Sequence, residues 1–506
     1  MRAIFHKIIF SWRQAPLGVF SNRLLATIHG PIGLGNVADV GFRNVTPESR
    51  RDNSVSDRTA DCRERASLGW VLIRLWTLRS AATTSGCGFV RTRQAANFLI
   101  ELLRFAPQSA GAAMFVISIP ALRRNTAILR GVKEAAGCRL VLALKGFSCW
   151  KAFPYLREDL DGCCASGLWE ARLAHEHFRK HLVTYSPAYD EEDVAALCEF
   201  TGHLDFNSLS QWFRFRGQVM AHPRFQSGEL RCGLRINPEC STGETPMYDP
   251  CVAGSRLGIT AGQLADADLT GISGLHFHTL CEQNSDALET TLAAVDEKFG
   301  HWLRAPQCTY LNMGGGHWIT KPFYDRERLI RLVREARERY GVEVWLEPGE
   351  AVAIHCGVLR ATVMDVFESA GHRLAILSIS ATAHMPDVLE MPYRPDVFLV
   401  DPAPSAALPA VAFEGENYHP ATQAGEWLYR LGGPTCLAGD VIGDFAFARA
   451  LKVGDTLVFD DMAHYTMVKT TLFNGVKHPP IVLQHEDGRL ETLREFTYQD
   501  FRDRLA

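Results

Sequence analysis

The sequence predicts an α/β fold in which an eight-fold β/α barrel is followed by a smaller, mostly β domain. Between Arg139 and Gly349, eight short apolar runs alternate with helix-length segments over roughly 210 residues, close to the typical size of such a barrel. After Glu350 the strand-like runs continue without regular helices between them. The expected divisions are residues 1–113 as an extension, 114–120 as a strand joining the β domain, 121–350 as the barrel and 351–506 as the β domain.

Residues 1–113 differ in composition from the rest of the 506-residue chain. They contain 15 Lys and Arg against 7 Asp and Glu, whereas the remainder contains 38 against 50. An Arg-rich, acid-poor segment is typical of an organellar targeting sequence or of a disordered basic arm. A third interpretation is an over-extended gene start, with Met114 as the true first residue. We favour this third interpretation because regular patterning begins at Met114.

The patterned region opens with a strand over Phe115–Ile119 and a helix from Pro120 to Ala136. Helices are also expected over Asp286–Leu303 and Asp325–Tyr340, where apolar residues recur every three or four positions. One long Gly- and Pro-containing excursion, Glu239–Thr270, is expected to form a loop above the barrel. The eight barrel strands are expected at Arg139–Lys145, Asp161–Ser166, His181–Pro187, His203–Ser208, Arg231–Pro238, Gly271–His278, Thr309–Gly316 and Val342–Gly349.

The β domain is expected to contain strands at Val352–Val363, Arg373–Ser380, Val397–Val400 and Thr456–Phe459. Within it, the loop Gly432–Asp444 has the sequence GGPTCLAGDVIGD and carries Cys436. Such a cysteine is a candidate nucleophile or proton donor, and the plainer interpretation is an inert buried thiol.

Composition excludes several classes of protein. The 14 cysteines show no CxxC pair and no metal-like spacing, which favours free thiols in a reducing, cytoplasmic compartment and argues against a metal site. The most membrane-like run, Trp70–Trp76, is short and contains Arg74. We expect neither a membrane nor a nucleic acid as a partner.

A β/α barrel carries its chemistry at the C-terminal ends of its strands. The first strand ends in Lys145, and a lysine among apolar residues is easier to deprotonate and to use as a nucleophile or in a Schiff base. A glycine triplet at the end of strand seven lets backbone N–H groups approach an anion, and barrels favour phosphate at strands seven and eight. Further polar residues follow other strands: Asn207, Ser208, Arg235, Asn237, His276, His278 and Glu347.

Each of these features also has a plainer interpretation. Lys145 could simply reach solvent at a strand end, the glycines could form a flexible turn, and His278 could be a core histidine. Their combination on neighbouring strand ends favours a site for a phosphorylated cofactor with a reactive carbonyl group.

At the level of motifs, the chain resembles the fold-type III pyridoxal-phosphate decarboxylases, which include ornithine, arginine and diaminopimelate decarboxylases. Within this group it is most similar to the carboxynorspermidine/carboxyspermidine decarboxylases. The resemblance implies a barrel of the alanine-racemase type and spans about Met114 to Gly475. The motifs that carry it are LALKGFS, FNSLSQ, LRINPE, GETPMYDPC with SRLGI, GLHFHTLCEQ, LNMGGGHW, LEPGEA, ATAHMPDVLEMPYRP, GPTCLAGD and DDMAHYTMVKTTLFNG.

The resemblance implies a role for each matching residue. Lys145 would bind pyridoxal 5'-phosphate covalently, His278 would stack on its ring, and Glu347 would pair with the ring nitrogen. Arg235 would support the ring or its neighbours. The phosphate would be held by Gly314, Gly315, Gly316 and Tyr465. Cys436 would come from the partner subunit of a homodimer with shared active sites, and would protonate Cα after carbon dioxide leaves.

Two departures from the family pattern affect how the cofactor phosphate is bound and which substrate is expected. Relatives often have arginine after the EPG triplet, where this chain has Glu350. Ornithine decarboxylases have aspartate after the loop cysteine, where this chain has Leu437, so ornithine is disfavoured. The net acidity of residues 114–506 suits a polyamine. The candidate amine contacts are Glu282, Asp387 and Asp440, with His384 nearby; the plainer interpretation of these acids is a solvated surface or a helix cap.

The resulting hypothesis is a homodimeric decarboxylase that converts carboxynorspermidine to norspermidine, or carboxyspermidine to spermidine. A diaminopimelate decarboxylase is the first alternative, with Arg394 as the candidate partner for a distal carboxylate. A catalytically silent regulator of polyamine synthesis is the second, and the intact set of Lys145, His278, Glu347 and Cys436 argues against it.

Overall fold

The computed structural model describes residues 113–243, 245–391, 393–400 and 418–506. Apart from Ala113, the predicted extension lies outside the described residues. Its three interpretations and the proposed division into domains therefore stay predictions. Among the described residues, no helix has both the length and the apolar character needed to cross a membrane.

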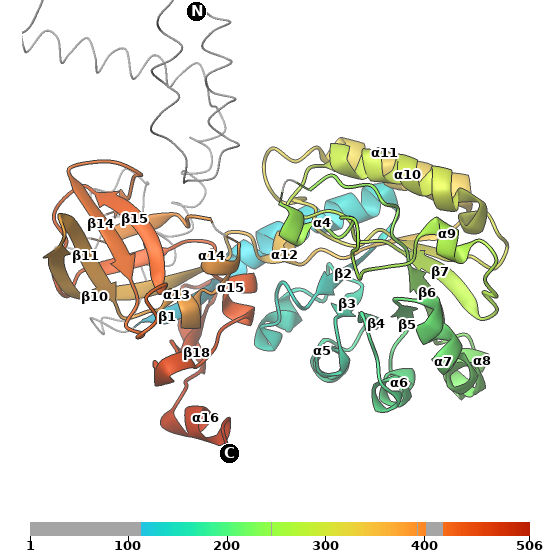
Figure 1. The fold of residues 1–506 in the computed structure, drawn as a ribbon, viewed down its shortest axis with the longest axis horizontal. Coiled ribbons are helices and arrows are strands. Elements are labelled where there is room, and N and C mark those ends of the chain that lie inside the picture. The colour runs from blue at the N-terminus through green and yellow to red at the C-terminus, as the bar shows by residue number, and fades with distance from the viewer. Residues whose placement is uncertain (1–112, 244, 392, 401–417) are drawn as a thin grey trace, which may run out of the picture. The chain divides into compact units, whose positions relative to one another are not determined.

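The described chain begins in the β domain and then enters the barrel (Figure 1). Strand β1 (Met114–Ser118) pairs antiparallel with β10 (Gly357–Ser369) and parallel with β17 (Ile481–Gln484). Helix α4 (Ile119–Ala136) follows directly, and the Ser118 side chain caps it by accepting from the backbone N–H of Ala121. The helix ends at Gly137, whose φ of 67° is the left-handed conformation that favours glycine.

The predicted barrel is confirmed. Strands β2 to β9 form a closed barrel in sequence order with parallel neighbours, and β9 returns to β2, where Trp345 pairs with Arg139. Each strand ends before the predicted apolar run does, so residues such as Lys145 and His278 lie just beyond the strands, at their C-terminal ends. The strands are β2 (Arg139–Ala143), β3 (Gly162–Ala165), β4 (His181–Tyr185), β5 (His203–Phe206), β6 (Arg231–Arg235), β7 (Ile272–His276), β8 (Tyr310–Asn312) and β9 (Glu343–Leu346).

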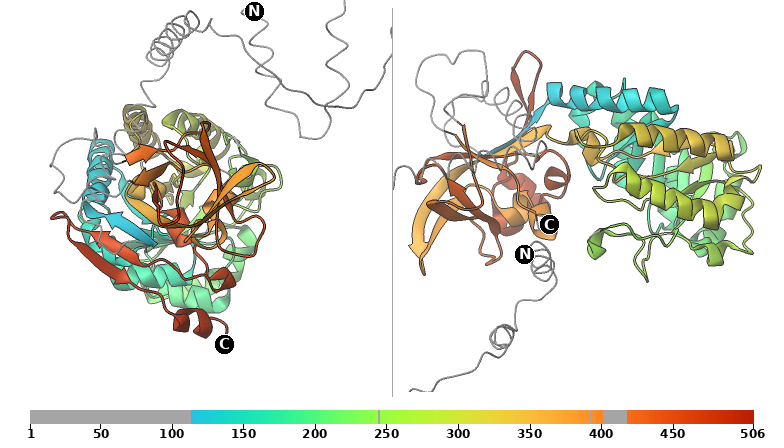
Figure 2. Two further views of the ribbon diagram at one scale, coloured as in Figure 1. Left: turned by 90° about the vertical axis from the view of Figure 1, so that its left-hand side faces the viewer. Right: turned by 90° about the horizontal axis from the view of Figure 1, so that it is seen from above.

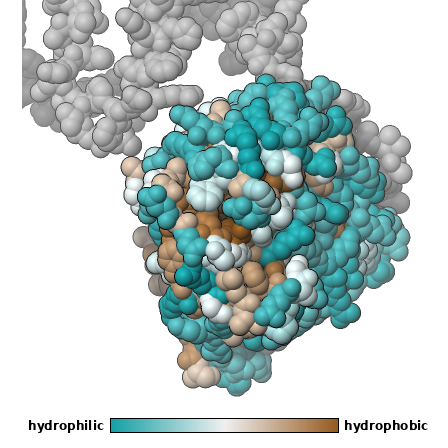
Figure 3. Space-filling view, turned by 90° about the vertical axis from the view of Figure 1, so that its right-hand side faces the viewer, coloured by the Kyte–Doolittle hydropathy of each residue, from teal (hydrophilic) through white to brown (hydrophobic). Residues whose placement is uncertain are grey.

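Helices cover the outside of the barrel. Figure 2 shows α4, α11 and α10 side by side, and these three helices are in contact. The face of the molecule in Figure 3 is mostly hydrophilic, with hydrophobic residues near its middle. The connecting helices are η1 (Trp150–Tyr155), α5 (Leu168–Leu173), η2 (Ala174–Phe178), α6 (Glu191–Cys198), α7 (Leu209–Ala221), α8 (Pro223–Gln226), η3 (Pro246–Tyr248), α9 (Ala261–Leu264), α10 (Ser285–Leu303) and α11 (Arg326–Tyr340).

The C-terminal part is mostly β, as predicted. Its sheet runs β13–β12–β16–β10–β1–β17–β18, and β11, β14 and β15 extend it from β10. Beyond the strands already given, it contains β11 (His372–Leu377), β12 (Val397–Val400), β13 (Tyr418–Pro420), β14 (Trp427–Gly432), β15 (Val441–Phe447), β16 (Thr456–Phe459) and β18 (Leu490–Arg494). Its short helices are α12 (Glu350–Ala353), α13 (Ala381–His384), α14 (Asp387–Glu390), α15 (Tyr465–Val468), η4 (Phe473–Gly475) and α16 (Tyr498–Asp503).

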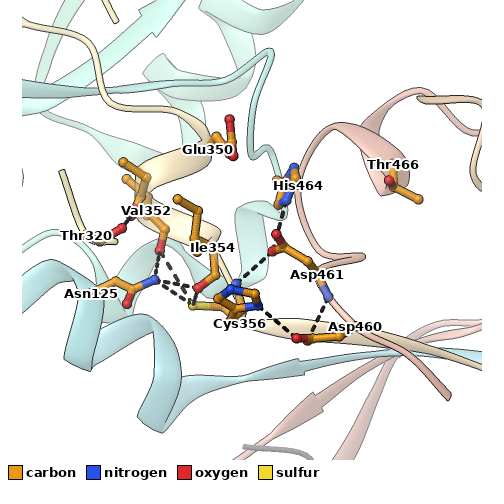
Figure 4. Close-up of polar contacts among 12 residues, drawn as sticks. Asn125, Thr320, Glu350, Val352, Ile354, Cys356, Asp460, Asp461, His464 and Thr466 are labelled. Atoms are coloured by element: carbon orange, nitrogen blue, oxygen red, sulfur yellow. Dashed lines mark hydrogen bonds and ion pairs between the residues drawn. The ribbon is translucent and has the colours of Figure 1, made fainter. Parts of the chain in front are cut away.

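One predicted strand, Val352–Val363, is wrong in its first part. Residues 350–353 form α12, and β10 begins only at Gly357. The intervening turn is held by Asn125 on α4, whose side-chain amide donates to the carbonyls of Val352 and Ile354 at 3.2 and 2.8 Å (Figure 4). Asn125, which donates hydrogen bonds to the carbonyls of this turn, is more than two hundred positions away, so the local sequence could not reveal the turn.

Candidate active site

A cavity of about 600 Å³ lies at the C-terminal ends of the barrel strands. Its wall has three sources. The barrel contributes strand-end residues including Lys145, Arg235 and Glu347, and the predicted excursion contributes residues from Pro246 to Leu257. The β domain contributes residues including Tyr465. A cavity at this edge of a barrel is the expected place for catalysis.

Lys145 and His278 face each other in this cavity. Lys145 Nζ lies 3.4 Å from His278 Nε2, and His278 Nδ1 accepts from the backbone N–H of Gly315 at 2.8 Å. Because Nδ1 is an acceptor, a neutral His278 carries its proton on Nε2. Although the Lys145 side chain is open to the cavity, burial of its amine lowers the pKa, and the nearby charge of Arg235 lowers it further. Burial lowers the pKa of His278 well below its usual range, and a positive charge on Lys145 or Arg235 lowers it further. The site therefore favours a neutral, nucleophilic amine.

Glu347 is a buried carboxylate that reaches the cavity wall, and it is only 5% exposed. Its Oε1 accepts from the side-chain amide of Asn312 at 2.6 Å, and its Oε2 lies 3.7 Å from Nε2 of His276. A carboxylate held in this way is suited to pair with a positively charged group in the cavity.

The glycine triplet is required mainly by close packing. Gly314 and Gly316 have positive φ values of 66° and 83°, and a Cβ on any of the three residues would collide with the backbone of a neighbouring strand end. Two of their N–H groups already have acceptors in the chain: that of Gly314 donates to Asn312 Oδ1 at 2.9 Å, and that of Gly315 donates to His278. Gly316 lines the cavity, so it is the member of the triplet best placed for an anion.

Arg235 and Tyr465 both line the cavity, Arg235 from the barrel and Tyr465 from the β domain. Arg235 Nη2 donates to the carbonyl of His278 at 3.0 Å, and its guanidinium lies 4.5 Å from the centre of the Tyr185 ring. Arg235 is thus fixed in place beside His278. Tyr465 begins α15 in the β domain, and burial raises the pKa of its phenol, which keeps the hydroxyl neutral.

A second part of the cavity is acidic. Glu282, Glu350 and Asp387 all line it. Burial and the neighbouring Glu350 raise the pKa of Glu282 to about 7, and Glu282 has a strained backbone φ of 53°. Lys469 Nζ contacts Asp387 at 2.5 Å, and Lys321 lies 3.8 Å from Glu350. Besides burial, Glu350 and Asp387 both raise the pKa of Glu282, so a positive charge on a ligand in the cavity would relieve the repulsion among these acids.

Three of the predicted site residues lie away from this cavity. Cys436 is exposed, and its thiol donates to Asn474 Oδ1 at 3.3 Å. Asp440 is 4% exposed; it accepts from the side chain of Ser380 at 2.9 Å and from the backbone N–H and hydroxyl of Thr435, which anchors the cysteine loop. His384 is fully buried, and its Nδ1 accepts from the N–H of Ser380. The single chain does not bring these three to Lys145, and their catalytic or substrate roles stay predictions.

The sequence analysis did not identify several residues that line the cavity or lie directly behind it. Tyr248, Arg256 and Lys469 line the cavity, and Asp205 lies behind it against His276. The sequence offered one signal for the residues behind the cavity. His276 and His278 are two positions apart at the end of one strand, so His276 could be expected to face the barrel interior as His278 does. The excursion residues carried no comparable signal, because loop conformation decides where they point.

Comparisons with known proteins agree with this geometry. The family model described as "Pyridoxal-dependent decarboxylase, C-terminal sheet domain" matches residues 54–463, a region that begins upstream of Met114. The chain belongs to the pyridoxal-dependent decarboxylases. This decarboxylase is 44% identical over 393 residues to a carboxyaminopropylagmatine decarboxylase of Synechocystis sp., covering 78% of the chain and 95% of the relative. It is 42% identical over 387 residues to a carboxynorspermidine/carboxyspermidine decarboxylase of Campylobacter jejuni, covering 76% and 96%.

Solved structures extend the comparison. The decarboxylase matches carboxynorspermidine decarboxylase from Campylobacter jejuni, solved with norspermidine, with a TM-score of 0.66 and 40% identity over 78% of this chain and 99% of that one. Diaminopimelate decarboxylase from Helicobacter pylori matches with a TM-score of 0.64 over 79% of this chain and 98% of that one, but at 13% identity it shares the fold alone.

Proposed function

We propose that this decarboxylase uses pyridoxal 5'-phosphate to remove the carboxyl group of a carboxylated polyamine, converting carboxynorspermidine to norspermidine or carboxyspermidine to spermidine. The observation that carries the proposal is a single cavity in which a lysine of lowered pKa, a buried glutamate and a group of three further acidic residues are combined. The 42% identity to the Campylobacter jejuni enzyme supports the same substrate class.

The residues of the cavity fit the cofactor. Its aldehyde needs a neutral amine, which Lys145 supplies, and its ring nitrogen needs a carboxylate, which Glu347 supplies. Its phosphate needs a close backbone approach and hydrogen-bond donors, for which Gly316 and the neutral Tyr465 line the wall. No arginine follows the EPG triplet, so the phosphate depends on these groups more than it does in relatives with arginine there.

Bound pyridoxal phosphate supplies an electron sink for the electrons left behind when carbon dioxide departs. The chain's own residues bind and orient the cofactor and the substrate. Lys145 provides the nucleophilic amine, His278 provides a flat ring beside it, and Glu347 favours a proton on a facing ring nitrogen. Cys436 of the partner subunit is the proposed donor of the proton that replaces the carboxyl group at Cα.

The acidic end of the cavity is the proposed site for the distal cationic part of the substrate. Glu282, Glu350 and Asp387 lie on different segments and all face the cavity, so they can contact more than one positive group along an extended chain. A guanidinium is a second candidate for this end, because carboxylates bind it in two-point contacts. The 44% identity to a carboxyaminopropylagmatine decarboxylase favours testing it.

The first prediction concerns substrate choice. We expect the full-length protein with pyridoxal phosphate to release carbon dioxide from carboxynorspermidine or carboxyspermidine with a kcat/KM at least about a hundredfold above that for ornithine or diaminopimelate, because the shorter substrates offer fewer positive groups to the acidic residues of the cavity. Carboxyaminopropylagmatine belongs in the same assay. If it is fastest, the guanidinium candidate is correct; if ornithine or diaminopimelate is fastest, the proposal is wrong.

The diaminopimelate alternative lacks its expected partner group. Arg394 donates to the carbonyl of Ile442 at 3.4 Å and does not line the cavity. The regulator alternative is disfavoured for a different reason, because Lys145, His278 and Glu347 are all present and gathered at one cavity. A cytoplasmic location, expected from the cysteines, stays a prediction; all cysteines among the described residues are free.

The second prediction tests the homodimer with shared sites. Lys145→Ala and Cys436→Ala should each lack activity alone, whereas subunits of the two variants mixed at equal ratio should recover about a quarter of wild-type activity, because half of the dimers then contain one intact site. Mixing Lys145→Ala with His278→Ala is the matched control. Both of these residues come from one barrel, so no activity should return. No recovery in the test mixture would show that Cys436 acts within its own subunit or not at all, and recovery in the control would show that Lys145 and His278 do not serve the same site.

A further inference from the structure

The interior of this barrel is unusually polar. Barrel interiors are normally filled by branched aliphatic side chains. Here the interior contains several buried polar or aromatic residues, each no more than 5% exposed: His203, Asp205, His276, Tyr310 and Trp345. Buried polar groups are costly unless they are paired, so this set calls for a physical reason.

His276 lies between two buried carboxylates. Its Nδ1 is 3.3 Å from Asp205 Oδ2, and its Nε2 is 3.7 Å from Glu347 Oε2. The exposed fractions of these three residues are 1%, 0% and 5%. Neither imidazole nitrogen makes a hydrogen bond among the described residues, and Asp205 and Glu347 are the carboxylates that lie within ion-pair distance of them.

The carboxylates are otherwise held by neutral donors. Asp205 Oδ1 accepts from the hydroxyl of Tyr310 at 2.7 Å, and Glu347 Oε1 accepts from Asn312 at 2.6 Å. In each case the second oxygen faces His276. An imidazole offers an N–H to both sides only when both nitrogens are protonated and the ring is cationic. A cationic ring would offset one of two negative charges that are shielded from water.

Other titratable groups lie around this set of three residues. Cys164 interacts with Glu347, and burial together with Glu347 raises the pKa of its thiol, which keeps it neutral. The ring of Tyr185 meets that of His276 edge-on at 5.3 Å, and Arg235 lies over Tyr185. The charge of His276 also acts on His278, beside Lys145. Arg235 lines the cavity with Glu347, whereas Asp205 does not line it, and His276 is the basic group that Asp205 faces.

We propose that His276 is a positioning residue: protonated on both nitrogens, it bridges Asp205 and Glu347 and keeps the Glu347 carboxylate ionised and directed into the cavity. The inference rests on the proposed cofactor site, because an ionised Glu347 is what favours a proton on the ring nitrogen of pyridoxal phosphate. His276 does not line the cavity, so it acts through Glu347 and not on the substrate.

The test uses the full-length protein with His276→Gln, Asp205→Asn and the double variant. The matched control is His203→Gln, another buried barrel histidine, which stacks on Tyr310 at 4.1 Å and forms no ion pair with a carboxylate among the described residues. Three readouts apply: the dissociation constant of pyridoxal phosphate from the apoprotein, kcat and KM, and the charge state of the His276 ring at pH 7 by NMR.

We expect His276→Gln to weaken pyridoxal phosphate binding about tenfold and to lower kcat about tenfold to a hundredfold with little change in KM, as for a lost electrostatic positioning group. His203→Gln should change each value less than about threefold. Adding Asp205→Asn to His276→Gln should cause less loss than the product of the two single effects, because it removes the carboxylate left without its counter-charge.

Equal behaviour of His276→Gln and His203→Gln would overturn the proposal, as would a neutral His276 ring in the wild-type apoprotein. If His276→Gln does not fold, the NMR measurement still decides, since it needs only the wild type. Failure of the wild type to bind pyridoxal phosphate would instead contradict the proposed function, while leaving the NMR result to test the ion bridge.

Discussion

Lys145→Ala is expected to abolish the visible absorbance of bound pyridoxal phosphate and to lower kcat by roughly four orders of magnitude or more, the scale seen when a nucleophile is removed from an active site. The reason is geometric as well as chemical. Lys145 is the lysine at the strand end beside His278 Nε2, and burial lowers the pKa of its amine, which favours the neutral form that can attack a carbonyl.

The absorbance spectrum of the purified variant, recorded with added pyridoxal phosphate, checks this expectation. Lys452→Ala is a suitable control, since Lys452 is exposed and does not line the cavity, and it should keep both the band and the activity. A band of wild-type strength in Lys145→Ala would contradict the assignment of Lys145.

Asp461→Asn is expected to lower the free energy of unfolding by about 2–4 kcal/mol near pH 6, because it removes the carboxylate paired with the buried His464 and one of the two carboxylates beside His355. Asp461 Oδ1 accepts from the backbone N–H of His355 at 2.7 Å and forms an ion pair with His464 Nε2 at 3.0 Å (Figure 4). Its side chain is a quarter exposed, and that of His464 is 9% exposed. Asparagine tolerates the φ of 62° at this position, so the change removes charge with little effect on the backbone.

The effect should depend on pH with a defined sign. Burial alone would lower the pKa of His355 and of His464. The carboxylates of Asp460 and Asp461 outweigh burial at His355, and Asp461 with Glu350 and Asp387 outweighs it at His464, so both pKa values rise to about 9. The stabilisation that comes from a raised histidine pKa is fully present below about pH 6.5, the pKa of histidine in the unfolded chain. It is lost as the pH rises through about 9, the pKa in the folded protein. For Asp461, the two histidines outweigh burial and lower the pKa, so its contribution is present above about 4 and is lost in acid.

The difference between wild type and Asp461→Asn should therefore be largest between about pH 4 and 6.5 and should shrink by pH 9 and above. Urea unfolding of the apoprotein at pH 6 and pH 9.5 measures it. Asp444→Asn is the control, because its ion pair with Arg430 is 45% exposed and should change stability little at either pH. A difference that is the same at both pH values would show that the charge of Asp461 does not act through these histidines.

Much of the fold follows from local sequence. All eight barrel strands and the helices α4, α10 and α11 were predictable, because alternation between apolar runs and amphipathic segments is a local property. For the same reason Lys145, Arg235, His278, Gly316 and Glu347 could be expected at one edge: parallel strands in a barrel all present their C-terminal ends there.

Other features depend on contacts between distant segments. The turn before β10 is set by Asn125, and the ion bridge at His276 joins β5, β7 and the end of β9. Neither arrangement leaves a pattern in nearby residues, because hydrogen-bond and charge partners far apart in sequence meet only after folding. The same holds for the acidic end of the cavity, where Glu282, Glu350 and Asp387 come from three segments. Periodicity and strand-end chemistry thus establish the class of fold and the cofactor-facing residues, whereas the protonation of those residues is decided by burial and by neighbours that only the folded chain supplies.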